Sequence, residues 1–416
     1  MSIQSNFPAI KPTLLLDFAN VKALDPRITF TRASTATYID QFGAMQTAAS
    51  GAARFDHNPT TLESLGLLIE EQRVNLMLYS EQFDNAAWTK TNSSITANTI
   101  VAPNGALTGD KLVEDTSSLA HTLSVAASVV SGTAYTNTLY AKKGERTQVG
   151  LSFATSGFGT TTTDFFDLDN GTVLTNASGT AAITSVGNGW YRISATRTAT
   201  ATVSSVFTFR LAVNGTGLYT GDGVSGIFIW GAQLEEAAFS TSYIATVASQ
   251  VTRSADAASM TGTNFSSWYN PTQGTIYAEG YLDKPATSGA QTRRLADIND
   301  GTSNNRILFG RAASATDLRV QYTVSNTNLN GTNGQTVISV FPSAKVAVAY
   351  QAANYAFSPN GDAVTTSTAA SVPVVNRLSI GGDPSNAAVG SANGTIKKLA
   401  YYPLRCTNTQ LQALTS

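Results

Sequence analysis

The sequence predicts an all-β protein made of two β-sandwiches in tandem, with a loop-rich segment before them. Runs rich in Val, Ile, Thr, Phe and Tyr recur along the chain, and Gly, Asn, Asp and Pro bound them. Pairs such as Asn188-Gly189 and Asn393-Gly394 supply the positive-φ residues that tight hairpin turns need. Helical periodicity is confined to brief stretches at 61–65 and 408–414, and nothing indicates a β-α-β alternation.

The clearest strand candidates are short and are separated by turn residues, which favours sandwiches. In chain order they are residues 13–18, 73–79, 148–153, 189–196, 206–213, 226–234, 274–281, 319–324, 345–350, 377–381 and 394–402.

Composition agrees with this fold class. A chain of 416 residues is too long for one ordinary core, so we expect two or three domains. Charged residues make up 13% of the chain, below the typical quarter, while 42% hydrophobic and 9% aromatic residues are enough for packed cores.

Charge and targeting features narrow the partners. The net charge is −1 and basic residues are dispersed, so no basic stripe is present and nucleic acid is not an expected partner. Residues 1–6 have neither the basic nor the apolar region of a secretory signal, and no run approaches a membrane span. We therefore expect synthesis in a cytoplasm without membrane insertion. The single cysteine, Cys406, excludes an intramolecular disulfide and is expected to fill a small buried space.

The chain divides into three parts. Residues 1–80 combine short strands with long loops, as in an attachment or adaptor segment that takes stability from its neighbours. Residues 81–250 and 262–416 each hold their own series of strands. Because the strands that open and close the last part both lie inside it, we expect residues 262–416 to fold alone.

Four phrases carry a resemblance to a known family. They are Phe30-Thr-Arg-Ala-Ser-Thr-Ala-Thr-Tyr38, Gly66-Leu-Leu-Ile-Glu-Glu-Gln-Arg-Val-Asn-Leu-Met-Leu-Tyr-Ser-Glu-Gln-Phe83, Gly226-Ile-Phe-Ile-Trp-Gly-Ala-Gln-Leu-Glu-Glu236 and Thr252-Arg-Ser-Ala-Asp256. Together these family phrases resemble virion proteins of tailed bacteriophages and prophages, fibre- or spike-like, with sugar-binding-type β domains. The resemblance covers residues 14–260.

Two further resemblances concern the sandwiches. The order of phrases from Glu81-Gln-Phe-Asp-Asn-Ala-Ala-Trp88 to Gly189-Trp-Tyr-Arg-Ile-Ser194 is similar to the jelly roll of carbohydrate-binding modules. The closing strand at 394–402, the amphipathic turn at 407–414 and the Gly381-Gly-Asp383 turn resemble the end of a concanavalin-A-like, laminin-G-type sandwich.

Catalytic groups are scarce. His57 and His121 are the only histidines and lie in different predicted domains, which disfavours a zinc site or a Ser-His-Asp triad. Glycoside hydrolysis needs two carboxylates flanking the scissile bond. The sequence has no Glu-x-Asp-x-Glu pattern, and the adjacent pairs Glu70-Glu71 and Glu235-Glu236 should point to opposite faces of a strand. We therefore expect no enzymatic activity, although a site assembled between subunits stays open.

Candidate binding residues are aromatic or oxygen-rich. Trp268 and Tyr269, flanked by polar residues, are the best candidates for an exposed aromatic pair that stacks on a sugar, and Trp88 is a further candidate in a polar loop. For each, packing at a domain joint or turn is the alternative. Asp297 and Asp300 lie in an oxygen-rich loop that would suit a structural calcium ion, the alternative being an ordinary Asx-turn.

The resemblance implies a homotrimeric fibre or spike subunit of the virion. Its N-terminal part would attach to other virion proteins of the capsid or tail, and its sandwiches would bind host cell-surface glycans without cleaving them. Two alternatives stay open, a head-fibre or capsid/tail decoration protein with a purely structural role and a glycan depolymerase with an inter-subunit site.

Overall fold

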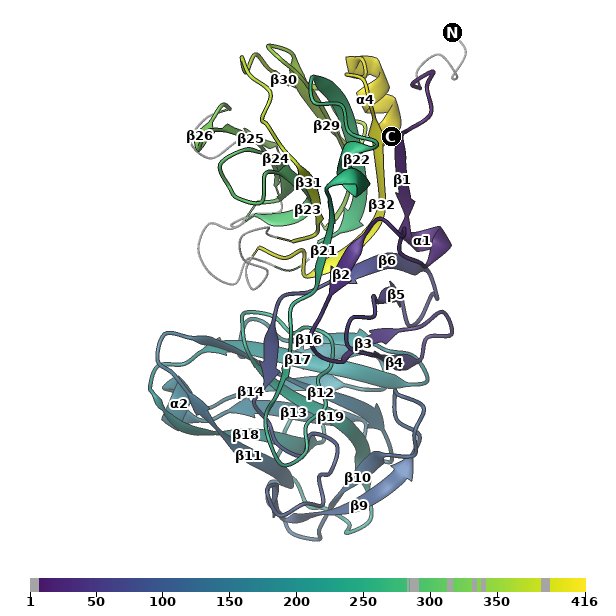
Figure 1. Cartoon of the computed structure of the whole chain (residues 1–416). Helices are drawn as coiled ribbons and strands as arrows, with labels where there is room; N and C mark the ends of the chain where they lie inside the picture. The colour runs from purple at the N-terminus through teal and green to yellow at the C-terminus, as the bar shows by residue number, and fades with distance from the viewer. Residues whose placement is uncertain are drawn as a thin grey trace.

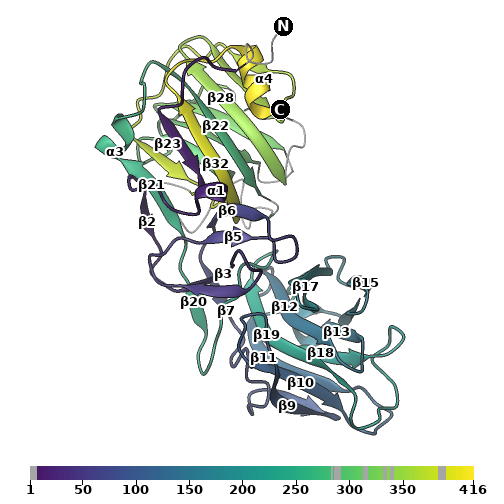
Figure 2. The same cartoon turned by 90° about the vertical axis from the view of Figure 1, so that its right-hand side faces the viewer.

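The computed structural model describes residues 7–282, 284, 292–312, 317–330, 335–337, 342–382 and 390–416. Strands dominate it, and the helices of the described residues are four short segments, α1 (Phe18–Val21), α2 (Thr155–Phe158), α3 (Thr263–Ser266) and α4 (Asn408–Thr415). Two sandwiches lie one beyond the other and are joined by a narrower region (Figures 1 and 2). The all-β prediction with two sandwiches is confirmed.

The sandwich formed by residues 89–236, which lies below the other in Figure 1 and is called the lower sandwich, consists of two six-stranded sheets. Their orders are β16-β17-β12-β19-β10-β9 and β15-β14-β13-β18-β11-β8. Alternate residues of facing strands, such as Leu139, Leu151 and Phe209, are fully buried and form one core. The strands are β8 (Thr89–Thr91), β9 (Ser93–Ile100), β10 (Gly109–Glu114), β11 (Thr122–Val129), β12 (Ala134–Lys143), β13 (Gln148–Phe153), β14 (Thr162–Asp167), β15 (Thr172–Thr175), β16 (Ala182–Ser185), β17 (Trp190–Thr198), β18 (Val203–Ala212) and β19 (Gly226–Glu236).

The upper sandwich consists of two eight-stranded sheets. One has the order β30-β29-β28-β22-β32-β6-β5 with β1 also on β32, and the other has the order β2-β21-β31-β23-β24-β25-β26 with β27 on β25. The strands are β1 (Leu14–Asp17), β2 (Thr29–Thr31), β5 (Phe55–His57), β6 (Ser64–Ile69), β21 (Ala257–Thr261), β22 (Gln273–Tyr281), β23 (Arg293–Asn299), β24 (Arg306–Arg311), β25 (Leu318–Val324), β26 (Thr327–Asn328), β27 (Gln335–Val337), β28 (Ser343–Gln351), β29 (Tyr355–Pro359), β30 (Thr365–Ser367), β31 (Arg377–Ile380) and β32 (Gly394–Tyr402).

The N-terminal part supplies strands to both sheets of the upper sandwich. Residues 14–17 pair with 398–401, residues 67–69 pair with 394–396, and residues 29–31 pair with 257–259. Figure 2 shows purple β1 alongside yellow β32. Leu14, Leu16, Leu67 and Ile69 lie in the same buried core as the C-terminal strands. The loop-rich appearance of residues 1–80 therefore arises because their strands are short and their partners lie far along the chain.

The lower sandwich is an insertion in the upper one. The chain leaves the upper sandwich through β7 (Arg73–Asn75) and returns to it through β20 (Val251–Arg253). These two strands pair antiparallel, with Asn75 opposite Val251. A second ribbon of β3 (Ala36–Ile39) and β4 (Met45–Ala48) lies in the same joint. Both crossings therefore run side by side between the sandwiches (Figure 2).

This pairing changes the expectation for residues 262–416. A fragment of that span lacks β1, β2, β6 and β21, so it would expose the edge of β32 and lose buried leucines and isoleucine from its core. We now expect it to lack a cooperative thermal transition by circular dichroism. Residues 7–75 joined to 251–416 through a short turn keep those strands and should melt cooperatively. A cooperative transition of equal midpoint in the shorter fragment would contradict this account.

Candidate functional site

Nine charged side chains meet in the joint between the sandwiches, and we call them the joint network. They come from the N-terminal part, the end of β19, the return through β20 and the start of β23. All are buried, and they are Arg32, Arg54, Glu70, Glu71, Arg73, Glu235, Arg253, Asp256 and Arg293.

Arg54 lies at the centre of one half of the joint network. Its Nη1 is 2.8 Å from Glu70 and its Nη2 is 2.6 Å from Asp256, while Arg253 approaches Glu70 to 2.7 Å. Glu70 also accepts hydrogen bonds from the backbone N–H and hydroxyl of Ser242. Burial alone would raise the pKa of Glu70, but Arg253, Arg54 and Ser242 together hold it well below its usual value.

Glu71 anchors the other half of the joint network. Its carboxylate pairs with Arg73 and, at 2.6 Å, with Arg293 of the upper sandwich. Arg253 joins the two halves because it pairs with Glu70 and donates to the backbone carbonyl of Glu71. The adjacent Glu70 and Glu71 thus bind different arginines, in line with the predicted divergence of their side chains.

All four family phrases supply residues to the joint network. Arg32, Glu70, Glu235 and Arg253 each belong to a different phrase. Sequence reasoning singled out the phrases without placing them together, because each phrase lies in a separate strand or loop. The Thr-Arg and Glu-Glu pairs were the available signal, since charged residues beside buried strands need partners.

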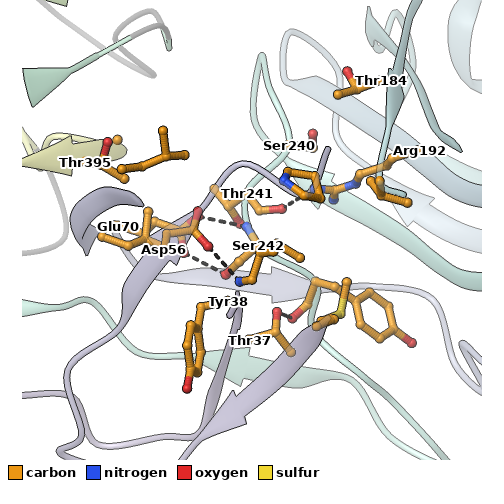
Figure 3. A pocket seen from close by; sticks show the side chains of 18 of the residues that line it. Thr37, Tyr38, Asp56, Glu70, Thr184, Arg192, Ser240, Thr241, Ser242 and Thr395 are labelled. Carbon is orange, nitrogen blue, oxygen red and sulfur yellow. Dashed lines mark hydrogen bonds between the residues drawn. The ribbon is translucent and has the colours of Figure 1, made fainter. Parts of the chain in front are cut away.

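A pocket of about 400 Å³ lies beside the joint network, and we call it the joint pocket. Its walls come from three parts of the chain. The N-terminal part contributes residues 37–39, 45, 56–59, 65, 68 and 70, the lower sandwich contributes residues of β12, β16 and β17 and the 240–243 loop, and the upper sandwich contributes residues 281, 284 and 393–395. Figure 3 shows side chains of these parts facing one another. Exposed Thr184 and Tyr281 lie at its rim, so the pocket opens to solvent. Both sandwiches and the N-terminal part are required to build it.

Several side chains of the joint pocket have buried polar atoms without a protein partner. These atoms are His57 Nε2, Arg192 Nε, Asn393 Nδ2 and Thr395 Oγ1, and the His57, Asn393 and Thr395 residues are each 4% exposed. Buried polar groups in folded proteins are nearly always hydrogen-bonded to protein, water or ligand. These pocket residues therefore keep hydrogen-bonding capacity that the protein itself does not satisfy.

The tautomer of His57 follows from its contact. Nδ1 lies 3.1 Å from the carbonyl oxygen of Ile39, which can only accept, so Nδ1 carries the proton in the neutral ring. Nε2 is then an acceptor. In Asn393 the atom without a partner is a donor. Its Oδ1 accepts from the Glu71 N–H at 2.8 Å, and its Nδ2 has no acceptor in the protein.

Asp56 is the carboxylate of the joint pocket outside the joint network. Its Oδ1 accepts from Ile39 N–H at 2.7 Å. Burial raises the pKa of Asp56 to about 6, against the lowering by that hydrogen bond and by Arg54.

Of the predicted sugar-stacking residues, Trp88 and Trp268 are buried and Tyr269 is half-buried. Trp88 is 1% exposed and donates through Nε1 to Tyr79, and Trp268 is 3% exposed and donates to Asn264. Tyr269 packs against the core of the upper sandwich. The expected exposure was wrong for the two tryptophans, because polar neighbours flank their rings along the chain while the rings themselves turn inward. Sugar binding by the three residues stays a prediction. None of them lines the joint pocket, and Tyr269 lines a second pocket with Phe265 and Pro271.

The predicted calcium loop has ordinary turn contacts. Asp300 Oδ1 accepts from the backbone N–H of Thr302 at 2.8 Å and from its hydroxyl at 2.6 Å, which is the Asx-turn alternative. Asp297 is fully buried, 3.4 Å from Arg294. Across the part of the chain that the structure describes, no group of three or more His, Cys, Asp or Glu side chains is placed to hold a metal. Calcium binding stays a prediction.

The described residues include no helix long and apolar enough to cross a membrane. Cys406 is fully buried, as expected of a small space-filling side chain, and burial raises the pKa of its thiol.

Comparisons with known proteins give distant structural similarity alone. No known family model matches the chain, and no curated protein matches it. The CBM40 of Ruminococcus gnavus IT-sialidase, bound to α2,3-sialyllactose, aligns with a TM-score of 0.28 and 19% identity over 37% of this chain and 87% of that one. Trypanosoma rangeli sialidase, with 2,3-difluorosialic acid, aligns with a TM-score of 0.30 and 9% identity over 78% of this chain and 62% of that one. Both TM-scores are low, and the function is inferred below from the geometry of this chain.

The joint network should be sensitive to the loss of one charge. Glu70→Gln leaves Arg54 and Arg253 buried with too few carboxylates, so we expect a loss of about 3–5 kcal/mol in the free energy of unfolding by urea denaturation. Glu63→Gln is the matched control, since Glu63 pairs with Lys397 at the surface and should change stability by less than about 1 kcal/mol. Equal effects of the two variants would contradict the structural role of the joint network.

Asp56 should make the protein less stable as pH rises. The folded-state pKa of about 6 exceeds the unfolded value of about 3.9, so the folded state binds more protons between these values and stability falls across that window. Asp56→Asn keeps an acceptor for Ile39 and removes the charge. We expect it to stabilise the protein by about 1–3 kcal/mol more at pH 7.5 than at pH 4, measured by denaturation at both pH values. The exposed control Asp84→Asn should show no such difference, and a pH-independent effect of Asp56→Asn would refute the assignment.

Proposed function

We propose that this protein is a subunit of a bacteriophage fibre or spike that binds host cell-surface glycans without cleaving them, and that the joint pocket is its glycan site. The observation that carries the glycan half is the set of buried, unpartnered polar atoms on the pocket walls. The virion half is supported by the four family phrases, which resemble those of virion fibre and spike proteins.

The chemistry of the joint pocket suits a polyhydroxyl ligand. His57 Nε2 accepts, Asn393 Nδ2 donates, and the Thr395 hydroxyl does either, so the walls match sugar hydroxyls that both donate and accept. Tyr38, which is half-buried, adds ring surface on which sugar C–H groups pack. The volume falls within the range of small-ligand sites.

The carboxylates of the joint pocket favour binding over hydrolysis. Glycosidases need one carboxyl group as an acid and a second as a nucleophile or base. Asp56, with its raised pKa, has the property of an acid, but Glu70 is held by Arg54, Arg253 and Ser242 and is not available as the second group. A depolymerase with a site between subunits is the alternative that the experiment below tests.

Attachment and avidity complete the proposal. The first described residues lie beside α4 at the far end of the upper sandwich, where Gln410 donates to the carbonyl of Phe7 at 3.4 Å (Figure 1). Attachment to capsid or tail proteins at this end would point the lower sandwich outward.

Weak binding at each site would still be useful in an assembly. A site with a millimolar dissociation constant has a binding free energy of about −4 kcal/mol, and a homotrimer with several linked sites would raise avidity by about 10²- to 10⁴-fold.

A decoration protein without a receptor is a second candidate. The joint network favours it, because buried charges connect the two sandwiches. Glu235 at the end of β19 lies 4.0 Å from Arg73, and Glu71 pairs with both Arg73 and Arg293 of the upper sandwich. A rigid spacer on a particle surface would require such a connection. Antibody labelling of intact particles in the electron microscope gives the location, head or tail, and adhesion to host cells distinguishes the two functions, since a head-fibre or capsid/tail decoration protein with a purely structural role would bind no host glycan.

Thr395→Val tests the glycan site. The hydroxyl has no partner in the protein, so the variant should keep the melting temperature while losing a hydrogen bond to the glycan. We expect binding to host capsule or lipopolysaccharide to weaken about 3- to 10-fold by biolayer interferometry. Thr96→Val, an exposed change on β9, is the control and should bind like the unaltered protein. Unchanged binding by Thr395→Val would remove the joint pocket as the site, and new reducing ends in the polysaccharide would refute the non-enzymatic function.

A further inference from the structure

We infer that the joint pocket selects a sugar unit that carries a carboxylate, and that Arg192 binds this carboxylate. The inference rests on the proposed function, because it names the class of glycan that the same pocket takes.

Arg192 reaches the joint pocket from β17 with spare hydrogen-bonding capacity. Nη1 donates to the carbonyl of Thr241 at 2.7 Å, and Nη2 makes a long contact of 3.4 Å with the hydroxyl of Thr138. A guanidinium has five N–H donors, so these two contacts leave three, including the unpartnered Nε–H. Tyr140 lies under the guanidinium, 5.4 Å from ring centroid to Cζ, and fixes its plane. The side chain is therefore held in position and is not saturated.

Arg192 also lacks a counter-ion. Among the described residues no carboxylate forms an ion pair with it, whereas Arg32, Arg54 and Arg253 nearby each have one. Arg197 and Arg210 of the same sandwich are also half-buried and have no ion pair among the described residues, but of these three arginines Arg192 is the one that lines the joint pocket. A carboxylate on the ligand would supply the missing partner through the planar, two-point geometry that guanidinium favours.

The other charged groups of the joint pocket leave room for an anion. Glu70 lines the pocket, but Arg54 and Arg253 neutralise it. The negative charge of ionised Asp56 would repel an anion. Burial raises the pKa of Asp56 to about 6, so this charge is lost under mildly acidic conditions.

A matched pair of polysaccharides tests the inference. One is a carboxylated polymer and the other is the same polymer with its carboxylates chemically reduced to alcohols, so that they differ in this group alone. Separate arms with a hexuronate polymer and a nonulosonate polymer distinguish the two common sources of a sugar carboxylate. The full-length chain should bind at least one carboxylated polymer about 10-fold or more tightly than its reduced form.

Variants assign the contact to Arg192. Arg192→Gln should bring binding of the carboxylated polymer down to that of the reduced one, and Arg192→Lys should restore only part of it because lysine lacks the two-point geometry. Arg197→Gln is the matched control, since Arg197 lies on the same strand but donates to Thr160 and Thr162 outside the pocket. It should leave binding unchanged.

The outcomes separate the two claims. Equal binding of the two polymers, weakened by Thr395→Val but not by Arg192→Gln, would overturn the carboxylate inference and leave the glycan site standing. Binding of neither polymer, with no effect of Thr395→Val on adhesion to host cells, would overturn the proposed function and with it this inference.

Discussion

Buried charges destabilise a protein unless they are paired, and the two sandwiches meet around nine of them. Arg54, Arg253 and Arg293 are almost fully buried, so each must keep its carboxylate partners in place. Those partners are Glu70, Glu71 and Asp256, which belong to the N-terminal part and to the segment that follows β20. The lower sandwich joins the network through Glu235, which lies 4.0 Å from Arg73, so the network helps to hold the relative orientation of the sandwiches.

The joint pocket depends on that orientation. His57 belongs to the N-terminal part, Arg192 to the lower sandwich and Thr395 to the upper one, and no single part could bring them together. Gly66 contributes to the closeness of the parts, because a Cβ there would lie 2.2 Å from the carbonyl oxygen of Ile396 and the backbone has φ of 93°. A rigid joint thus holds a polar pocket open without needing an occupant to stabilise it.

The fold class and many strands were predictable from local sequence, whereas the joint was not. The strand candidates at 148–153, 226–234 and 394–402 correspond to β13, β19 and β32, because each is long enough to show a buried pattern and is bounded by turn residues. Strands of three residues such as β2 and β20 show little pattern by themselves, since their stability comes from partners far along the chain. Edge strands such as β9 were missed because Ser, Thr and Asn dominate them.

The candidate site was missed for a related reason. Trp268 and Trp88 stood out by composition, but polar flanking residues do not report which way a ring turns, and both rings lie in the cores. His57 and Arg192 carried no local signal, because what marks them is an absent partner, a property of the folded arrangement. The Thr-Arg and Glu-Glu pairs of the family phrases were a usable signal, because their charged side chains contribute to the joint network beside the pocket.

The most direct measurement is a crystal structure of the full-length protein with a carboxylated host oligosaccharide. The account predicts density for a sugar ring in the joint pocket, with its carboxylate on Arg192 and its hydroxyls within hydrogen-bonding distance of His57 and Thr395. An oligosaccharide bound elsewhere on either sandwich, with the joint pocket holding water alone, would contradict it.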